Sequence, residues 1–178
     1  MAEILALDDA GGGARAMDLF PTRCTNEAVR DRLMKTDAAQ LFPGARDPES
    51  ALSGLFLYFS CLKEAHDLLH TFGGGESAYW HGIMHRMEGD AYNAGYWFRR
   101  VRRHPLFPAL QHEAAQLGYG PGCEWEPLAF VDFCDAAAHT KERSKNEDLA
   151  KRIQLIEWQL LFDYCAAAAT ATESVAAR

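Results

Sequence analysis

Hydrophobic residues recur along most of this chain at intervals of three and four, the spacing of one face of an α-helix. Val and Ile, which strands favour, are few, whereas Ala is abundant. We therefore expect an all-α fold: a single-domain helical bundle of about seven helices over residues 25–170, with a loosely ordered N-terminal arm at 1–24 and a frayed C-terminus at 171–178. Between the turn signals, the pattern predicts helices over 25–34, 48–72, 77–88, 91–103, 106–117, 127–139 and 144–169.

Several local signals place the ends of these helices. Thr25 can cap the first helix with its hydroxyl group, and Asp47-Pro48-Glu49 is a cap followed by proline at the first helical position. Three consecutive glycines, 73–75, end the helix that starts at Pro48, and Ser144 to Glu147 form a capping box. Residues 48–72 are therefore predicted to form one long helix.

Charge and cysteine content narrow the possible partners. The 178 residues include 25 acidic and 18 basic side chains, a net charge of −7, which argues against a nucleic-acid binder. The five cysteines form no CxxC pair, so we expect reduced, mostly buried thiols in a cytoplasmic protein. No segment is apolar over enough residues to span a bilayer, so no membrane partner is expected, and a homo-oligomer is left open.

Most of the candidate metal-binding and ligand-binding side chains lie in residues 76–105. His81, His85 and Glu88 stand at i, i+4 and i+7 on one helical face, a spacing that lets two imidazoles and a carboxylate reach one divalent metal ion. His66 falls on the apolar stripe of the preceding helix and lies level with Gly82 if the two helices form an antiparallel hairpin. The sequence thus predicts a pocket lined by His66, His81, His85 and Glu88.

A basic cluster follows at 99–103. At a helix C-terminus such cations are favoured by the helix dipole alone. They also offer a guanidinium fork to a carboxylate or phosphate, and Arg99 and Arg100 are the candidates for holding an anionic ligand.

Three interpretations of the histidines remain open: structural side chains, which are the commonest case, a pocket for a small molecule, or a metal site with a divalent ion as cofactor. The preferred function is binding of a small polar or anionic ligand in the histidine-lined pocket. If catalysis follows binding, a neutral histidine next to Glu88 would be the general base.

Residues 76–105 also resemble one tetratricopeptide helical hairpin, with Gly82, Gly89-Asp90, Ala94, Trp97-Phe98 and Val101 in register and Pro105 ending the second helix one residue early. The resemblance implies two helices in close contact through small residues. It also supplies the alternative function, a protein-interaction module without catalytic activity, although no second copy of the repeat is found. The strings Tyr79 to Arg86 and Tyr96 to Val101 resemble a family of uncharacterised bacterial proteins, which implies no activity.

Overall fold

A computed structural model describes residues 17–73, 76–120, 122–139 and 143–168, and within these ranges the prediction of an all-α domain is confirmed. The described residues form nine helices and no strand. The tail expected at 171–178 and most of the expected arm lie outside them, while Met17 and Leu19 are buried in the core. The helices are α2 (Glu27–Leu33), α3 (Ala38–Leu41), α4 (Pro48–Tyr58), α5 (Leu62–Phe72), α6 (Ser77–Met87), α7 (Ala91–Val101), α8 (Phe107–Gln116), α9 (Pro127–His139) and α10 (Arg143–Ala166).

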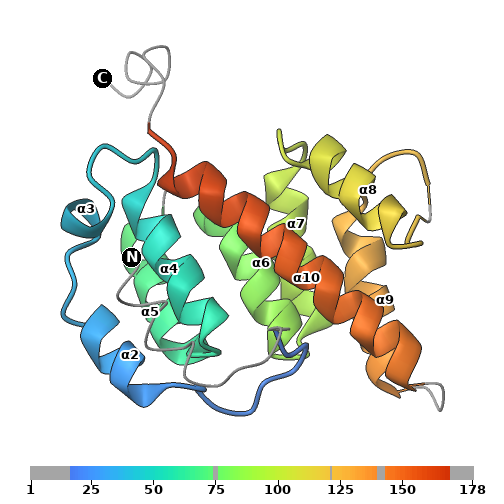
Figure 1. The fold of residues 1–178 in the computed structure, drawn as a ribbon, viewed down its shortest axis with the longest axis horizontal. Coiled ribbons are helices and arrows are strands. Elements are labelled where there is room, and N and C mark those ends of the chain that lie inside the picture. Colours follow the sequence, from blue (N-terminus) through green and yellow to red (C-terminus); the bar gives the residue numbers. More distant parts are fainter. Residues whose placement is uncertain (1–16, 74–75, 121, 140–142, 169–178) are drawn as a thin grey trace.

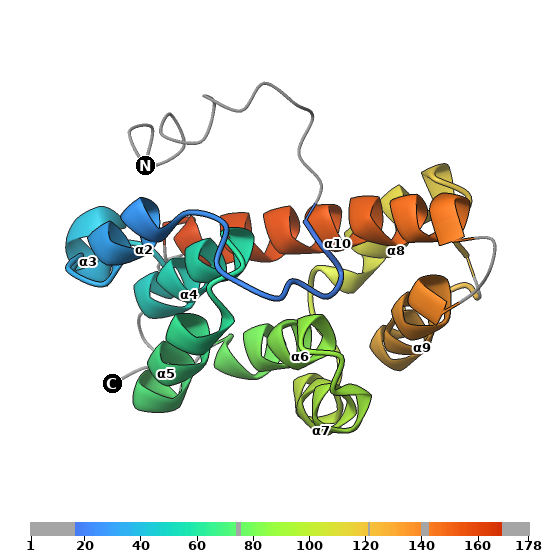
Figure 2. The ribbon, with the colours of Figure 1, turned by 90° about the horizontal axis from the view of Figure 1, so that it is seen from below.

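Helix α10 is the axis of the fold. It has 24 residues and crosses the molecule in Figure 1, packing against α4, α8 and α9. Seen from below, α4 and α5 lie toward one of its ends, α9 toward the other, and α6 and α7 between them (Figure 2). Trp158 of α10 is buried and its indole N–H donates to the carbonyl oxygen of Gly54 at 2.7 Å.

The prediction of one helix over 48–72 is wrong, because the chain turns sharply after Tyr58. Ser60 has φ 58°, in the left-handed region, and the Cys61 N–H donates back to the Phe56 carbonyl at 2.8 Å. Thr25 supports the turn from outside: its N–H and hydroxyl group both donate to the Phe59 carbonyl, at 2.8 and 3.0 Å. Thr25 therefore does not cap α2; that cap is Asn26.

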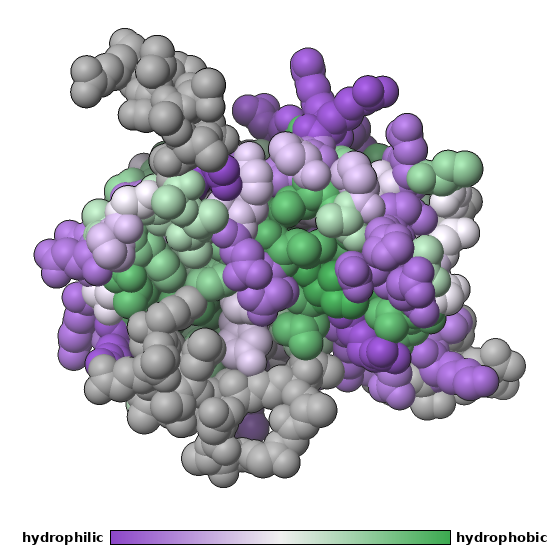
Figure 3. Space-filling model, turned by 45° about the horizontal axis from the view of Figure 1, so that its top comes forward, coloured by the Kyte–Doolittle hydropathy of each residue, from purple (hydrophilic) through white to green (hydrophobic). Residues whose placement is uncertain are grey.

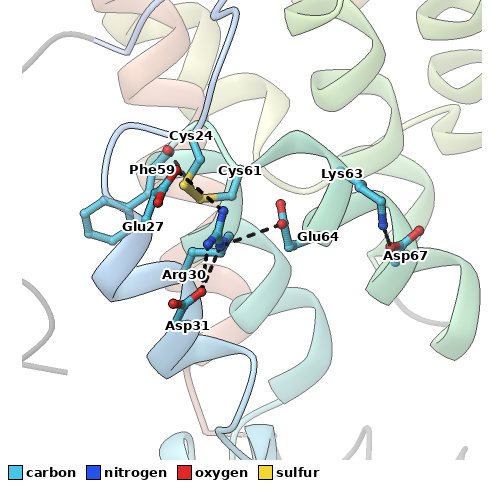
Figure 4. Close-up of polar contacts among 9 residues, drawn as sticks. All are labelled: Cys24, Glu27, Arg30, Asp31, Phe59, Cys61, Lys63, Glu64 and Asp67. Carbon is cyan, nitrogen blue, oxygen red and sulfur yellow. Dashed lines mark hydrogen bonds and ion pairs between the residues drawn. A yellow bond between two sulfur atoms is a disulfide. The ribbon is translucent and has the colours of Figure 1, made fainter.

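The expectation that all cysteines are reduced is also wrong. Cys24 and Cys61 form a disulfide between the segment before α2 and the start of α5 (Figure 4). Helix α2 itself is linked to α5 by Arg30, whose guanidinium contacts Asp31 and lies 3.9 Å from the Glu64 carboxylate. Two distant stretches of sequence are thus held together by a covalent and an electrostatic link. Of the remaining cysteines, Cys134 and Cys165 are free and buried, and Cys123 is free and exposed.

Helices α6 and α7 form a tight hairpin. Gly82 lies directly against the ring of Phe98, and a Cβ atom at Gly82 would stand 2.8 Å from that ring. Phe98 is itself buried, so the ring has no free space to enter. The close approach that small residues were expected to allow is therefore present in this hairpin.

We expect Gly82→Ala to lower the free energy of unfolding by about 1–3 kcal/mol, because the added methyl group overpacks the α6–α7 contact. The matched control is Gly95→Ala on α7, where the nearest atom to the new Cβ is the end of the exposed Arg99 side chain, at 3.3 Å. The control should be neutral or gain up to about 1 kcal/mol of helix propensity. Urea denaturation followed by circular dichroism measures both, and equal effects at the two glycines would contradict the expectation.

The surface of the described residues exposes a few large hydrophobic side chains. Figure 3 shows hydrophilic side chains over much of one face, with hydrophobic ones gathered near its centre. The exposed large hydrophobic residues come from three helices, α5, α7 and α9, and from the C-cap of α2: Met34, Phe72, Tyr92, Tyr96 and Leu128. None of the described helices has the length and hydropathy needed to cross a membrane.

Candidate functional site

Three histidines from two helices converge on one point. His66 and His70 are one turn apart on α5, and their Nε2 atoms lie 3.0 Å from each other. His81 of α6 completes the group, since one ring nitrogen from each residue falls within 4.8 Å of the other two. His81 is 1% exposed, His66 is half-buried and His70 is exposed. The group therefore reaches from the α5–α6 interface to the surface.

The hydrogen bonds of His81 determine which of its nitrogens is available. Nδ1 lies 2.9 Å from the Ser77 carbonyl oxygen, an acceptor only, so Nδ1 carries the proton and donates it. Nε2 is then an unprotonated lone pair, buried and without a hydrogen-bond partner. A metal-ligating histidine is typically oriented by such a bond from its other nitrogen. Trp97 fixes the ring further, stacking on it at 4.0 Å between centroids and 12° between planes.

Burial favours the neutral form of His81 and His66. It lowers the pKa of His81 to about 4, partly opposed by the Ser77 hydrogen bond and aided by the charges of His70, His66 and His85. The pKa of His66 is lowered by burial and then by His70 and His85. Neutral imidazole is the form that binds a metal ion, so these two side chains are ready for it near neutral pH.

Of the residues predicted as metal ligands, His81 belongs to the converging group, whereas His85 and Glu88 form a separate pair. His85 Nδ1 lies 2.9 Å from a carboxylate oxygen of Glu88, so these two side chains pair with each other. The His85 ring is 5.5 Å from that of His66 and 6.3 Å from that of His81, centroid to centroid. The predicted neighbourhood of His66, His81 and His85 is thus present, with the His85–Glu88 pair beside the converging group.

The two candidate arginines, both on α7, lie in different surroundings. Arg100 lines a cavity together with His70, His81 and Trp97. Arg99 does not line it; its guanidinium lies near Gly95 and Leu128. Of the two anion candidates, only Arg100 is within reach of the histidines.

Sequence reasoning missed the role of His70. Its spacing of four from His66 was available as a signal, but its position off the apolar stripe favoured His66 alone. The break at Ser60 also matters, because it makes α5 a short, separate helix that can present both histidines to α6.

A second polar cluster, also missed, lies deep in the core. Arg86 and Glu157 are both buried and form a salt bridge through Nη2 and Oε2. The Tyr79 hydroxyl group donates to the other Glu157 oxygen at 3.0 Å, and the Arg86 Nε donates to Gln154 at 3.3 Å. Burial, the largest single influence, lowers the pKa of Arg86, but the charge and hydrogen bond of Glu157 together with Cys134 and Tyr79 outweigh it, so the pKa is raised overall. The cluster therefore joins α6 to α10 through buried polar contacts.

No protein-family model, curated protein or solved structure matches the chain. Its function is therefore inferred from the geometry of the site.

Proposed function

We propose that the protein binds a divalent transition-metal ion, with Zn²⁺ the best fit, through the Nε2 atoms of His66, His70 and His81. The observation that carries this is the convergence of one ring nitrogen from each of the three histidines within 4.8 Å, with the Nε2 of His81 buried, unprotonated and without a hydrogen-bond partner. An unsatisfied buried acceptor costs about 1–3 kcal/mol, and a metal ion would satisfy it.

The donor set supports this choice of ion. Imidazole nitrogens suit Zn²⁺, Cu²⁺, Fe²⁺ and Ni²⁺, whereas Mg²⁺ and Ca²⁺ require oxygen ligands. Zn²⁺ binds imidazole at about 2.0–2.1 Å, so tetrahedral ligand atoms lie about 3.4 Å apart. The ring nitrogens of the three histidines lie within 4.8 Å of one another, and those of His66 and His70 are 3.0 Å apart, which brackets that spacing. Three protein ligands leave a fourth position for water or substrate, as in catalytic zinc sites.

The test is a titration of chelator-treated protein with Zn²⁺ by calorimetry, and with Co²⁺ by visible absorption. We expect one ion per chain and a dissociation constant in the micromolar range or below. His70→Ala should weaken binding by about 100-fold or more, because it removes a direct ligand. His70 is exposed, so this variant should fold normally.

His112→Ala is the matched control, because His112 lies on α8 away from the group, and it should bind like the wild type. His81→Ala tests the buried ligand directly, with thermal unfolding as a check on its fold. No bound ion in the wild-type chain, or equal affinity in the His70 and His112 variants, would refute the proposal.

The alternative remains a tetratricopeptide-like interaction module built on the α6–α7 hairpin. No observation in the described residues favours it over the metal site. We propose that the protein is cytoplasmic. Thiols are normally kept reduced in the cytoplasm, so the Cys24–Cys61 disulfide is the observation that stands against this compartment. Counting free thiols in freshly isolated protein tests it, with five expected if the cytoplasm keeps the pair reduced and three if the bond is present.

A further inference from the structure

A small cavity of about 240 Å³ opens beside the converging histidines. Its walls include His70 and His81 from the group itself, Ser77 at the start of α6, and Trp97 and Arg100 from α7. Pockets for drug-sized molecules are typically about 300–1,000 Å³, so this cavity suits a ligand of only a few heavy atoms.

The charges around the cavity select the kind of ligand. A divalent ion held by three neutral imidazoles keeps its full positive charge, because none of its ligands is a carboxylate. The carboxylates that act on the histidines are already paired: Glu88 with His85, and Asp67 with Lys63. A negatively charged ligand is therefore the natural complement of the site.

Arg100 adds a second positive group on the same cavity. Its guanidinium donates to the Tyr96 hydroxyl group at 3.3 Å and lies 5.6 Å from the Trp97 ring centroid. In the described part of the chain it makes no ion pair with a carboxylate. An exposed guanidinium with free N–H groups can hold the oxygens of a carboxylate or phosphate.

Building on the metal site proposed above, we propose that this cavity binds a small oxyanion, with one oxygen on the fourth position of the metal ion and another on Arg100. The anion class is that of carboxylates and phosphates, of which acetate and inorganic phosphate are the simplest members. Trp97 lines the same cavity and holds the His81 ring in place by stacking on it.

The experiment uses the Co²⁺-loaded full chain, since the visible absorption of Co²⁺ changes when an oxygen ligand replaces water. Acetate and inorganic phosphate are titrated separately at constant ionic strength. We expect a saturable spectral change with at least one of them, and an affinity about tenfold lower in Arg100→Gln. Arg103→Gln, which alters a neighbouring arginine outside this cavity, is the matched control and should behave like the wild type.

The outcomes separate the two proposals. If Co²⁺ does not bind, the metal site and the anion site both fail. If Co²⁺ binds and neither anion changes its spectrum, only the anion site fails. If the anions bind equally well to wild type and Arg100→Gln, the assigned role of Arg100 is wrong and the proposal is overturned.

Discussion

Replacing Arg86 with methionine should lower the free energy of unfolding by about 3–5 kcal/mol. The substitution keeps most of the side-chain volume but removes the cation that faces Glu157, which is fully buried. Glu157 would retain the Tyr79 hydroxyl group as its only strong partner and would be left as a desolvated charge. Chemical denaturation followed by circular dichroism measures the loss.

The double variant Arg86→Met with Glu157→Met distinguishes a lost salt bridge from a general packing defect. With both charges removed, no unpaired ion remains in the core, and most of the lost stability should return. If the double variant is less stable than Arg86→Met, the buried charge of Glu157 is not the origin of the effect.

Lowering the pH should destabilise the metal-free protein between about pH 6.5, the ordinary pKa of histidine, and the pKa of His81 at about 4. Above this range His81 is neutral in both the folded and the unfolded chain. Within this range His81 is protonated in the unfolded chain but stays neutral in the folded chain. The free energy of unfolding therefore falls by about 3 kcal/mol in total. His66, whose pKa is also lowered, acts in the same direction.

Urea denaturation of chelator-treated protein at several pH values tests this result. Carboxylates contribute to any acid destabilisation, so the comparison that matters is with His81→Gln, which should show a flatter pH dependence. His139→Gln, an exposed histidine at the end of α9, is the control and should follow the wild type. Equal slopes in wild type and His81→Gln would contradict the assignment.

The helical class and most helix positions could be predicted from sequence because hydrophobic periodicity and caps are local signals. The hairpins around Gly73 and Gly89 follow from the same signals, and with them the meeting of His66 with His81. The break at Ser60 could not be predicted, because it depends on contacts with Thr25 and Cys24, more than thirty residues away in sequence.

The sequence predicted which residues lie near the candidate site, but not which of their nitrogen atoms are available there. The spacing of His81, His85 and Glu88 places them on one face of α6, yet their hydrogen bonds decide which nitrogen is available, and these involve Ser77 and Glu88. The buried Arg86 was invisible for a similar reason. Charged residues usually lie at the surface, and its partner Glu157 comes from a helix 71 residues further along the chain.

The turn at Ser60 leaves α5 between two closures of the chain. The disulfide closes one ring from Cys24 to Cys61, and a bound metal ion would close the next from His66 to His81. The two rings are consecutive and are opened by different reagents, the first by a thiol reductant and the second by a chelator. With both in place, removing either link leaves α5 tied to a neighbouring segment by the other.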